Sequence, residues 1–286
     1  MANSPTIDLD RSLLDELSSL VSRAGAAILA LRAGSLEVQA KADHSPVTAA
    51  DHASEAVMAE GISRLLPGVS IVSEEAVGSS PPSKLAGTFV LVDPLDGTRE
   101  FIAGRDEFTI NLALVTEGSP RLGIVAAPAR ALQWRGIEGH GAERLLLATG
   151  APATAARERA AIRTRPCPRS GFIVTVSRSH LDPETAGLLA RLPIGERTAC
   201  GSAIKFCRLA EGAADFYPRL STTCEWDVAA GHAVLAAAGG VVVTPEGEAL
   251  TYGHVEAELR IPSFMAWGDP SAPRVFGLGR GQGGKV

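Results

Sequence analysis

The chain has 286 residues, of which 45% are hydrophobic and 21% are charged. This composition excludes collagen-like, disordered and small disulfide-stabilised proteins, and the length suits one large domain or two medium ones. The 32 acidic and 27 basic residues give a formal net charge of −5, so no global positive field is available to attract nucleic acid or an anionic membrane.

The cysteines and the ends of the chain bear on its compartment. The sequence contains no C-x-x-C pair, which favours buried free thiols in a reducing compartment over a zinc site. The cysteines are Cys167, Cys200, Cys207 and Cys224. The N-terminus has no basic residue before Arg11 and no apolar h-region, which argues against a secretory signal. The most apolar stretch, 228–243, is shorter than the roughly 20 residues that a membrane span needs. We therefore expect a cytoplasmic protein with no integral membrane segment.

Two helices and a run of strands are predicted in the first half of the chain. Leucines and other apolar residues recur at three- and four-residue steps over 9–31, which indicates an amphipathic helix. A second helix should run from Thr48 to 66, because Thr48 and Asp51 have the spacing of a capping box. The strands expected after it are 69–73, 89–92, 108–115, 122–126 and 144–148.

The second half alternates strands with helices, which is typical of an α/β arrangement. Strands are expected at 172–176, 197–199, 214–217, 240–244 and 263–267, and helices at 183–192, 202–211 and 226–238. Residues 150–170 show little pattern and are interpreted as a junction. We therefore expect an N-terminal α+β subdomain over residues 1–160 and a C-terminal α/β subdomain over 161–286.

A cluster of candidate metal ligands lies in the sequence VDPLDGTREF at 92–101, where a hydrophobic strand is expected to end. Asp93 and Asp96, three residues apart on a turn, can converge on one point, and carboxylate oxygens suit Mg²⁺. If a helical turn begins near Gly97, the N–H groups of Gly97 and Thr98 would point at an anion. An ordinary turn is the alternative, since Asp, Pro and Gly are common in turns.

Four further acids are candidates for the same site. Glu74 and Glu75 directly follow the expected strand 69–73, so neighbouring strands could deliver them to the same end as the first cluster; a solvated loop is the alternative. Asp227 opens a predicted helix, where it could simply complement the helix dipole. The capping role of Asp51 likewise needs no catalysis.

Six short segments, in this order along the chain, carry a resemblance to a known family. They are SPVTAAD at 45–51, SEE at 73–75, DPLDGTREF at 93–101, EFTIN at 107–111, GSAIKFC at 201–207, and the run 217–231 that contains YPR and EWDVAAG. Together they resemble the lithium-sensitive, magnesium-dependent phosphomonoesterases of the inositol monophosphatase and fructose-1,6-bisphosphatase superfamily. The resemblance implies a mixed α/β fold, layered as an α-β-α-β-α sandwich.

The resemblance also implies roles for individual residues. The implied ligands of Mg²⁺ are Glu74, Asp93, the backbone carbonyl of Leu95, Asp96 and Asp227. Glu75, Asp51 and Thr98 would lie behind them, with Asp51 and Thr98 orienting the attacking water; the implied catalytic residues are thus Asp51, Glu74 and Thr98. Because four ligand carboxylates carry four negative charges, at least two Mg²⁺ are needed before a phosphate dianion can approach, and a third would make the site positive.

The sequences of the motifs favour one substrate class. DGT followed by REF resembles the bisphosphate nucleotidase branch, whereas inositol phosphatases commonly show DGT-x-NF. The implied substrate contacts are Glu74, Leu95, Asp96, Gly97, Thr98, Ser202, Lys205 and Asp227. Lys205 and Arg219 are candidates for a distant second phosphate, while Arg99 and Arg105 are interpreted as solvated surface residues.

The expected reaction is removal of the 3′-phosphate of adenosine 3′,5′-bisphosphate to give AMP, with 3′-phosphoadenylyl sulfate as a second candidate substrate. The alternative is an inositol monophosphatase or other sugar-phosphate phosphatase. A catalytically silent phosphate-binding paralogue is disfavoured because every implied ligand position holds a suitable acid. We expect a small-molecule substrate, no nucleic acid, and a monomer or homodimer; attachment to the inner membrane, found in relatives, leaves no mark here.

One segment departs from the pattern of the branch. Between Arg219 and Glu225 the chain reads LSTTC, where the branch often has Gly and Pro. Cys224 could then be a redox-sensitive thiol beside the site, although a buried bystander is the preferred interpretation.

Overall fold

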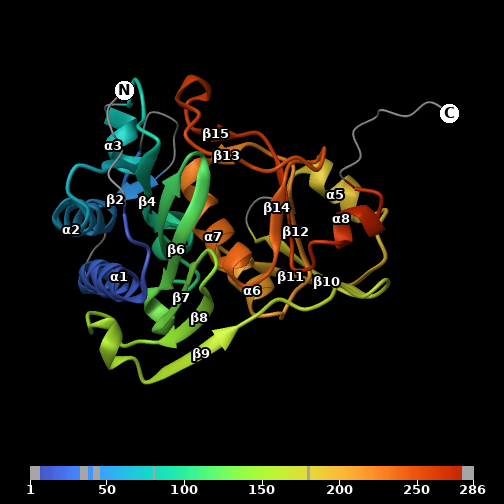
Figure 1. Ribbon diagram of the computed structural model, residues 1–286, viewed down its shortest axis with the longest axis horizontal. Helices are drawn as coiled ribbons and strands as arrows, with labels where there is room; N and C mark the ends of the chain where they lie inside the picture. The colour runs from blue at the N-terminus through green and yellow to red at the C-terminus, as the bar shows by residue number, and fades with distance from the viewer. Residues whose placement is uncertain (1–6, 33–37, 41–45, 80, 179–180, 279–286) are drawn as a thin grey trace.

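Five alternating layers make up the molecule (Figure 1). The computed structural model describes residues 7–32, 38–40, 46–79, 81–178 and 181–278. Along the long axis the order is a helix pair, a large sheet, a second helix pair, a smaller sheet and a third helix pair. This confirms the α-β-α-β-α sandwich. Ser45, the first residue of the SPVTAAD segment, lies outside the described residues.

The outer helix pair consists of α1 (Arg11–Arg32) and α2 (Ala49–Leu65). Apolar residues of α1 such as Leu17, Val21 and Ile28 are fully buried, as expected for a helix with one apolar face. The predicted capping box is present at the start of α2, where Thr48 is the N-cap and Asp51 accepts from its backbone N–H.

The first sheet has seven strands in chain order, and only its first pair is parallel. The strands are β3 (Ser70–Ser73), β4 (Thr88–Asp96), β5 (Thr109–Thr116), β6 (Ser119–Ala127), β7 (Leu132–Ile137), β8 (Gly141–Leu146) and β9 (Glu158–Ile162). Short helices follow two of them: α3 (Glu74–Ser79) after β3 and α4 (Thr98–Ile102) after β4. The 3₁₀ turns η1 (Pro128–Arg130) and η2 (Ala153–Ala155) occupy connections.

The second sheet has the order β11-β10-β12-β16-β14. Its strands are β10 (Phe172–Ser177), β11 (Ile194–Cys200), β12 (Phe216–Arg219), β14 (Val241–Val243) and β16 (Phe264–Trp267). Helices α6 (Ile204–Ala210) and α7 (Ala229–Ala237) lie between the two sheets, and α5 (Pro183–Leu189) and α8 (Ala272–Val275) cover the outer face. Smaller elements are β1 (Val38–Ala40), β2 (Pro46–Thr48), β13 (Thr223–Cys224), β15 (Arg260–Ile261), η3 (Glu225–Asp227) and η4 (Val255–Ala257).

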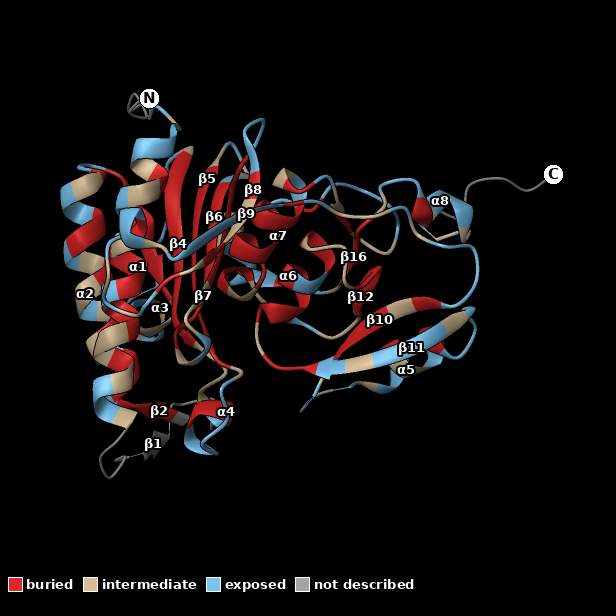
Figure 2. Cartoon of the chain, turned by 90° about the horizontal axis from the view of Figure 1, so that it is seen from below, coloured by how far each residue is buried: buried red, intermediate tan, exposed pale blue. Residues whose placement is uncertain are grey.

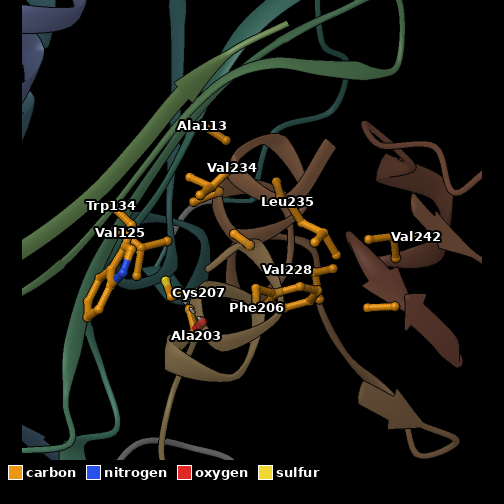
Figure 3. Close-up of a cluster of buried hydrophobic side chains, with 14 of the residues drawn as sticks. Ala113, Val125, Trp134, Ala203, Phe206, Cys207, Val228, Val234, Leu235 and Val242 are labelled. Atoms are coloured by element: carbon orange, nitrogen blue, oxygen red, sulfur yellow. Dashed lines mark hydrogen bonds between the residues drawn. The ribbon is translucent and has the colours of Figure 1, made fainter. Parts of the chain in front are cut away.

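The middle helix layer joins the two sheets through one hydrophobic cluster. Figure 3 shows Val125 and Trp134 of the first sheet on one side of Phe206 and Leu235, with Val242 of the second sheet on the other. Figure 2 shows buried residues on the central strands and on α6 and α7, with exposed residues on α1, α2 and the edge strands β9 and β11. The cluster therefore fixes the two sheets relative to each other.

Several sequence expectations need correction. β7 and β9 were not predicted: β7 carries a buried arginine, Arg135, paired with Asp15 and Glu143 at 2.6 Å each, which masks the strand pattern. β9 is an edge strand of alanine and charged residues inside the stretch 150–170, which was interpreted as a junction. The division predicted at residue 160 falls within this strand and stays a prediction.

Element ends also differ from the expectation in several places. The helix expected over 226–238 is a 3₁₀ turn followed by α7, and the helix expected over 183–192 ends at Leu189. β4 continues four residues beyond the predicted 92, and β11 is longer than 197–199. Within the described parts of the chain, no helix is both long and apolar enough to cross a membrane.

A close backbone approach between β6 and α7 is permitted by Gly123. A Cβ atom at this position would lie 2.4 Å from the carbonyl oxygen of Ala230 and 2.7 Å from the Cβ of Ala233. Since α7 begins two residues after Asp227, this contact restrains the distance between the first sheet and that carboxylate.

Substitution Gly123→Ala is expected to lower the free energy of unfolding by about 1–3 kcal/mol, because α7 must move away from β6. Urea unfolding measures this change. The control is Gly187→Ala in α5, where no atom lies within 4 Å of the added Cβ and the backbone φ is ordinary; helix propensity predicts a gain of up to about 1 kcal/mol there. An equal loss in both variants would contradict the close-approach argument.

Candidate functional site

A cavity of about 430 Å³ opens between the ends of the two sheets. All the residues predicted as metal ligands or substrate contacts line it: Glu74, Asp93, Leu95, Asp96, Gly97, Thr98, Ser202, Lys205 and Asp227. Asp51 and Glu75, which were expected behind the ligands, do not. Arg99 and Arg219 also contribute to the lining, whereas Arg105 does not. The structure thus brings residues from both halves of the chain to one place.

The carboxylates of the DPLD segment are delivered by a bulge in β4, not by a turn after it. Asp93 pairs with Asn111 and Asp96 pairs with Thr109, so three steps on β4 lie opposite two on β5. Pro94, which has no N–H to give to the ladder, occupies this irregularity. The predicted turn is therefore wrong in type, but the bulge has the effect attributed to it, because both aspartates reach the cavity.

Glu74 reaches the cavity from the neighbouring parallel strand. Ser73, the last residue of β3, is in register with Val92 of β4, so Glu74 and Asp93 occupy successive equivalent positions. Glu74 and Glu75 form the first turn of α3, not the solvated loop that was the alternative. Parallel pairing explains why two segments 19 residues apart present their acids at one edge of the sheet.

Asp96 is oriented by hydrogen bonds to a single oxygen. Its Oδ2 accepts from the Ala203 backbone N–H at 2.7 Å, the Asn111 amide at 3.2 Å and the Thr109 hydroxyl at 3.3 Å. Burial and the charge of Asp227 nevertheless raise the pKa of Asp96 to about 6. Because Oδ2 is fixed, the second carboxylate oxygen, Oδ1, has a defined position from which it can bind a ligand.

Asp227 is contributed by the second half of the chain, at the end of η3. Its Oδ2 accepts hydrogen bonds from the Thr223 hydroxyl and from the Cys224 backbone N–H. Thr223 and Cys224 form β13, which pairs with β15, so the LSTTC departure ends in a short strand. As in Asp96, hydrogen bonds hold one oxygen of the carboxylate.

Asp93 lies at the centre of the negative charge. It is 1% exposed, and burial together with repulsion from Glu74, Asp96 and Asp227 raises the pKa of Asp93 well above its usual range. Such mutual repulsion is what a bound cation would relieve.

The donor set fits Mg²⁺ in its chemistry, because it consists of carboxylate and carbonyl oxygens. Among the described residues, no group of three or more His, Cys, Asp or Glu side chains is already arranged to hold a metal ion. The acids share a cavity without closing round one point, which is consistent with the repulsion at Asp93.

Asp51 and Thr98 form a hydrogen-bonded pair beneath the cavity. Asp51 is 1% exposed, and its Oδ2 accepts from the Thr48 N–H at 2.8 Å and the Thr48 hydroxyl at 2.7 Å. The Thr98 hydroxyl lies 3.3 Å from Asp51 Oδ1 and 3.2 Å from the Leu95 carbonyl oxygen. The capping box thus also orients the carboxylate that faces Thr98.

Cationic and aromatic groups from the second half form the opposite wall. The Lys205 ammonium, 4% exposed as a residue, donates to the Ser202 carbonyl at 2.6 Å and lies 5.1 Å from the ring centroid of Tyr217. Arg219 is partly buried, and the nearby Tyr217 and Asp227 raise its pKa despite the opposing effect of burial. Cations and carboxylates thus face a common space.

Sequence reasoning missed part of this arrangement. Thr109 and Asn111, which orient Asp96, are buried polar residues inside the hydrophobic strand β5, and that interruption is the signal that could have identified them. Tyr217 was not assigned to the site either. The Ser202 hydroxyl donates to the backbone carbonyls of Asp96 and Glu107, at 2.9 and 2.8 Å, so its predicted substrate contact stays a prediction.

Cys224 does not have the properties of a reactive thiol. Burial and the neighbouring Asp227 raise its pKa to about 12, so the sulfur stays protonated near neutral pH. This favours the interpretation of Cys224 as a buried thiol without a redox role at the site.

Comparisons with known proteins find matches over most of the chain. The model of the inositol monophosphatase family matches residues 10–263. The chain is 40% identical over 256 residues to the 3′(2′),5′-bisphosphate nucleotidase CysQ of Escherichia coli, covering 88% of this chain and 98% of the relative. It is 32% identical over 244 residues to the CysQ of Buchnera aphidicola, covering 85% and 88%.

Solved structures show the same fold. The crystal structure of CysQ from Bacteroides thetaiotaomicron matches with a TM-score of 0.72 at 31% identity, over 92% of this chain and 98% of the other. The Thermotoga maritima IMPase matches with a TM-score of 0.74 over 92% and 95% of the chains, and its 22% identity shows the fold alone.

The crowded carboxylates predict that a divalent cation stabilises the fold. At about pH 8, MgCl₂ should raise the Tm of the wild-type chain above that in NaCl of matched ionic strength. Asp93→Asn keeps the acceptor for the Leu95 N–H, which lies 3.0 Å from Asp93 Oδ1, but removes one repelling charge. This variant should have a higher Tm without Mg²⁺, by about 2–4 °C for each kcal/mol of repulsion removed, and a smaller response to Mg²⁺.

Thermal unfolding followed by circular dichroism measures both effects. Exposed Glu246 supplies the control, since it is not among the cavity-lining residues, and Glu246→Gln should leave the Mg²⁺ response unchanged. A wild-type Tm that does not respond to Mg²⁺ would contradict the cation site.

Proposed function

This chain belongs to the inositol monophosphatase family, and we propose that it is a Mg²⁺-dependent 3′(2′),5′-bisphosphate nucleotidase that converts adenosine 3′,5′-bisphosphate to AMP and phosphate. One observation carries the proposal: a single cavity has a carboxylate side around Asp93 and Asp96 and a cationic side at Lys205 and Arg219. Identity to proteins named CysQ supports the substrate class. 3′-Phosphoadenylyl sulfate is proposed as a second substrate.

The proposed metal site uses oxygen atoms from both halves of the chain. The proposed ligands are the carboxylates of Glu74, Asp93, Asp96 and Asp227 and the carbonyl oxygen of Leu95, all from residues lining the cavity. When bound, two or three Mg²⁺ would supply positive charge for the phosphate and a water of lowered pKa. The hydrogen bonds that hold Oδ2 of Asp96 and Oδ2 of Asp227 support this assignment, because they fix how both carboxylates present their other oxygen.

Thr98 and Asp51 are proposed to orient the attacking water. A hydroxyl has one proton, so when Thr98 donates it to Asp51 Oδ1, its lone pairs remain to accept a hydrogen bond from water. The two hydrogen bonds from Thr48 keep the Asp51 carboxylate in place. Glu74, which lines the cavity beside Asp93, completes the proposed catalytic group.

The phosphate that reacts is proposed to sit against Gly97 and Thr98 at the start of α4. Gly97 has φ of +91°, and a Cβ there would lie 2.4 Å from the Ser202 hydroxyl oxygen, so glycine alone leaves the backbone open at this point.

Substrate selectivity is attributed to the wall formed by the second half. A bisphosphate nucleotide needs a cation for its second phosphate and an apolar surface for its base. Lys205 and Arg219 offer the charge, and the rings of Phe206 and Tyr217, with centroids 5.0 Å apart, offer the surface. Ser202, whose proton is engaged by backbone carbonyls, would act there as an acceptor.

We further propose that the enzyme acts in the cytoplasm on a small molecule, without nucleic acid, as a monomer or homodimer. All four cysteines are free, which supports a reducing compartment.

A phosphate-release assay across three substrates tests the proposal. With Mg²⁺, kcat/KM for adenosine 3′,5′-bisphosphate should exceed that for inositol 1-phosphate and for fructose 1,6-bisphosphate by about 10- to 100-fold, the range that charge-assisted hydrogen bonds to a second phosphate and contacts to the base supply. Asp96→Asn should remove turnover on all three substrates.

Preference for inositol phosphate would establish the alternative activity instead. Absence of turnover on every substrate would favour the silent phosphate-binding paralogue. Unchanged turnover in Asp96→Asn would refute the metal assignment.

A further inference from the structure

Glu107 connects the two halves of the chain beside the cavity. Its carboxylate accepts from Arg178, which follows β10, through Nε to Oε2 and Nη2 to Oε1 at 3.0 Å each. Oε2 also accepts from the Gly201 backbone N–H at 3.0 Å. Glu107 precedes β5 of the first sheet, so these bonds cross from one half to the other.

The segment that Glu107 holds is Gly201–Ser202–Ala203, just before α6. A Cβ at Gly201 would lie 2.7 Å from the Glu107 carbonyl oxygen, so only glycine permits this approach. The Ser202 hydroxyl donates to that same carbonyl, and the Ala203 N–H donates to Asp96 Oδ2. The segment is thus anchored to Glu107 on one side and to the proposed metal ligand Asp96 on the other.

Ser202 adopts a conformation that its surroundings must maintain. Its φ is +51°, in the left-handed region that a residue with a Cβ seldom occupies. Hydrogen bonds to Glu107 and Asp96 on either side hold it there. Without the Glu107 anchor, this backbone would be expected to relax.

Relaxation of the backbone at Ser202 would move Lys205. The ammonium of Lys205 is held by the Ser202 carbonyl at 2.6 Å and the Cys200 carbonyl at 3.5 Å, and these two residues flank Gly201. The position of the Lys205 charge is therefore set by the backbone that Glu107 anchors.

The carboxylate is suited to this task because it is ionised. Burial acts to raise its pKa, but the Gly201 N–H and the Arg178 guanidinium hold the pKa of Glu107 below its usual range. Arg178 also donates to the Ala199 carbonyl at 2.9 Å, which ties the end of β11 to the same contact.

We propose that Glu107 is a positioning residue for substrate selection. By holding Gly201 and Arg178, it keeps the Lys205 ammonium, which is proposed to bind the second phosphate, at a fixed distance from the Asp96 side of the cavity. This inference rests on the proposed nucleotidase function. It assigns Glu107 no contact with substrate.

Kinetics and binding of adenosine 3′,5′-bisphosphate on the full chain test the inference. Glu107→Ala is expected to raise KM about tenfold while kcat stays within about twofold, because the distant phosphate loses its cation. Glu107→Gln keeps an oxygen for the Gly201 N–H and should bring KM back to within about threefold of wild type. Asp106→Ala is the matched control, since Asp106 is the adjacent acid and pairs at 2.7 Å with Arg32 of the first half.

A double-mutant cycle separates positioning from general destabilisation. In a Lys205→Ala background, Glu107→Ala should change KM by less than about twofold, since the group it positions is gone. Arg178→Ala provides a second variant should Glu107→Ala fail to fold, with a smaller rise of KM expected. Calorimetric Kd values with Mg²⁺ should follow the same order, measured for AMP, which keeps the second phosphate, where the bisphosphate is turned over, and for the bisphosphate itself where it is not.

The outcomes distinguish this inference from the function on which it rests. Suppose that the wild type turns over the bisphosphate. If KM is then unchanged in Glu107→Ala and Arg178→Ala, or if Glu107→Ala raises KM by the same factor with and without Lys205→Ala, only the role of Glu107 is overturned. Absence of wild-type turnover together with the expected order of Kd values overturns the nucleotidase activity and upholds Glu107. A chain that neither turns over nor binds the bisphosphate overturns both.

Discussion

Repulsion among carboxylates that share one cavity is the constraint on which the rest of this structure depends. Asp93, Asp96 and Asp227 line one cavity, and burial together with their mutual charge raises the pKa values of the first two. A fold keeps such a cluster only if its surroundings hold each group firmly. Here the bulge in β4, the amide of Asn111 and the donors of the β13 segment perform that task.

The two-sheet sandwich explains how acids from distant parts of the chain meet. The parallel pair β3 and β4 brings Glu74 beside Asp93, while α7, packed closely on β6 at Gly123, fixes Asp227 opposite them. Of the cations, Lys205 belongs to α6 of the middle helix layer and Arg219 ends β12 of the second sheet. The cations thus come from other layers than Asp93 and Asp96 of the first sheet, and the polar contacts of Glu107 and Asp96 with the segment before α6 link the two sides.

Much of this could be predicted from the sequence because the signals are local or carried by motifs. The periodicity of α1, the capping box at Thr48 and the DPLDGT run each depend on neighbouring residues. What escaped prediction depends on long-range pairing. Arg135 disguises β7 until its partners Asp15 and Glu143 are seen, and the bulge at Pro94 appears only when β4 is paired with β5. Bonds from Glu107 to residues 71 and 94 positions away have no counterpart in sequence periodicity.

The central claim, that these carboxylates form a metal site for phosphate-ester hydrolysis, is tested most directly by locating the metal. Crystals grown with Mn²⁺ in place of Mg²⁺ would reveal the ion by anomalous scattering. The account predicts anomalous peaks in the cavity within bonding distance of Asp93, Asp96 and Asp227 carboxylate oxygens. A saturated, active enzyme whose Mn²⁺ peaks lie elsewhere would contradict it.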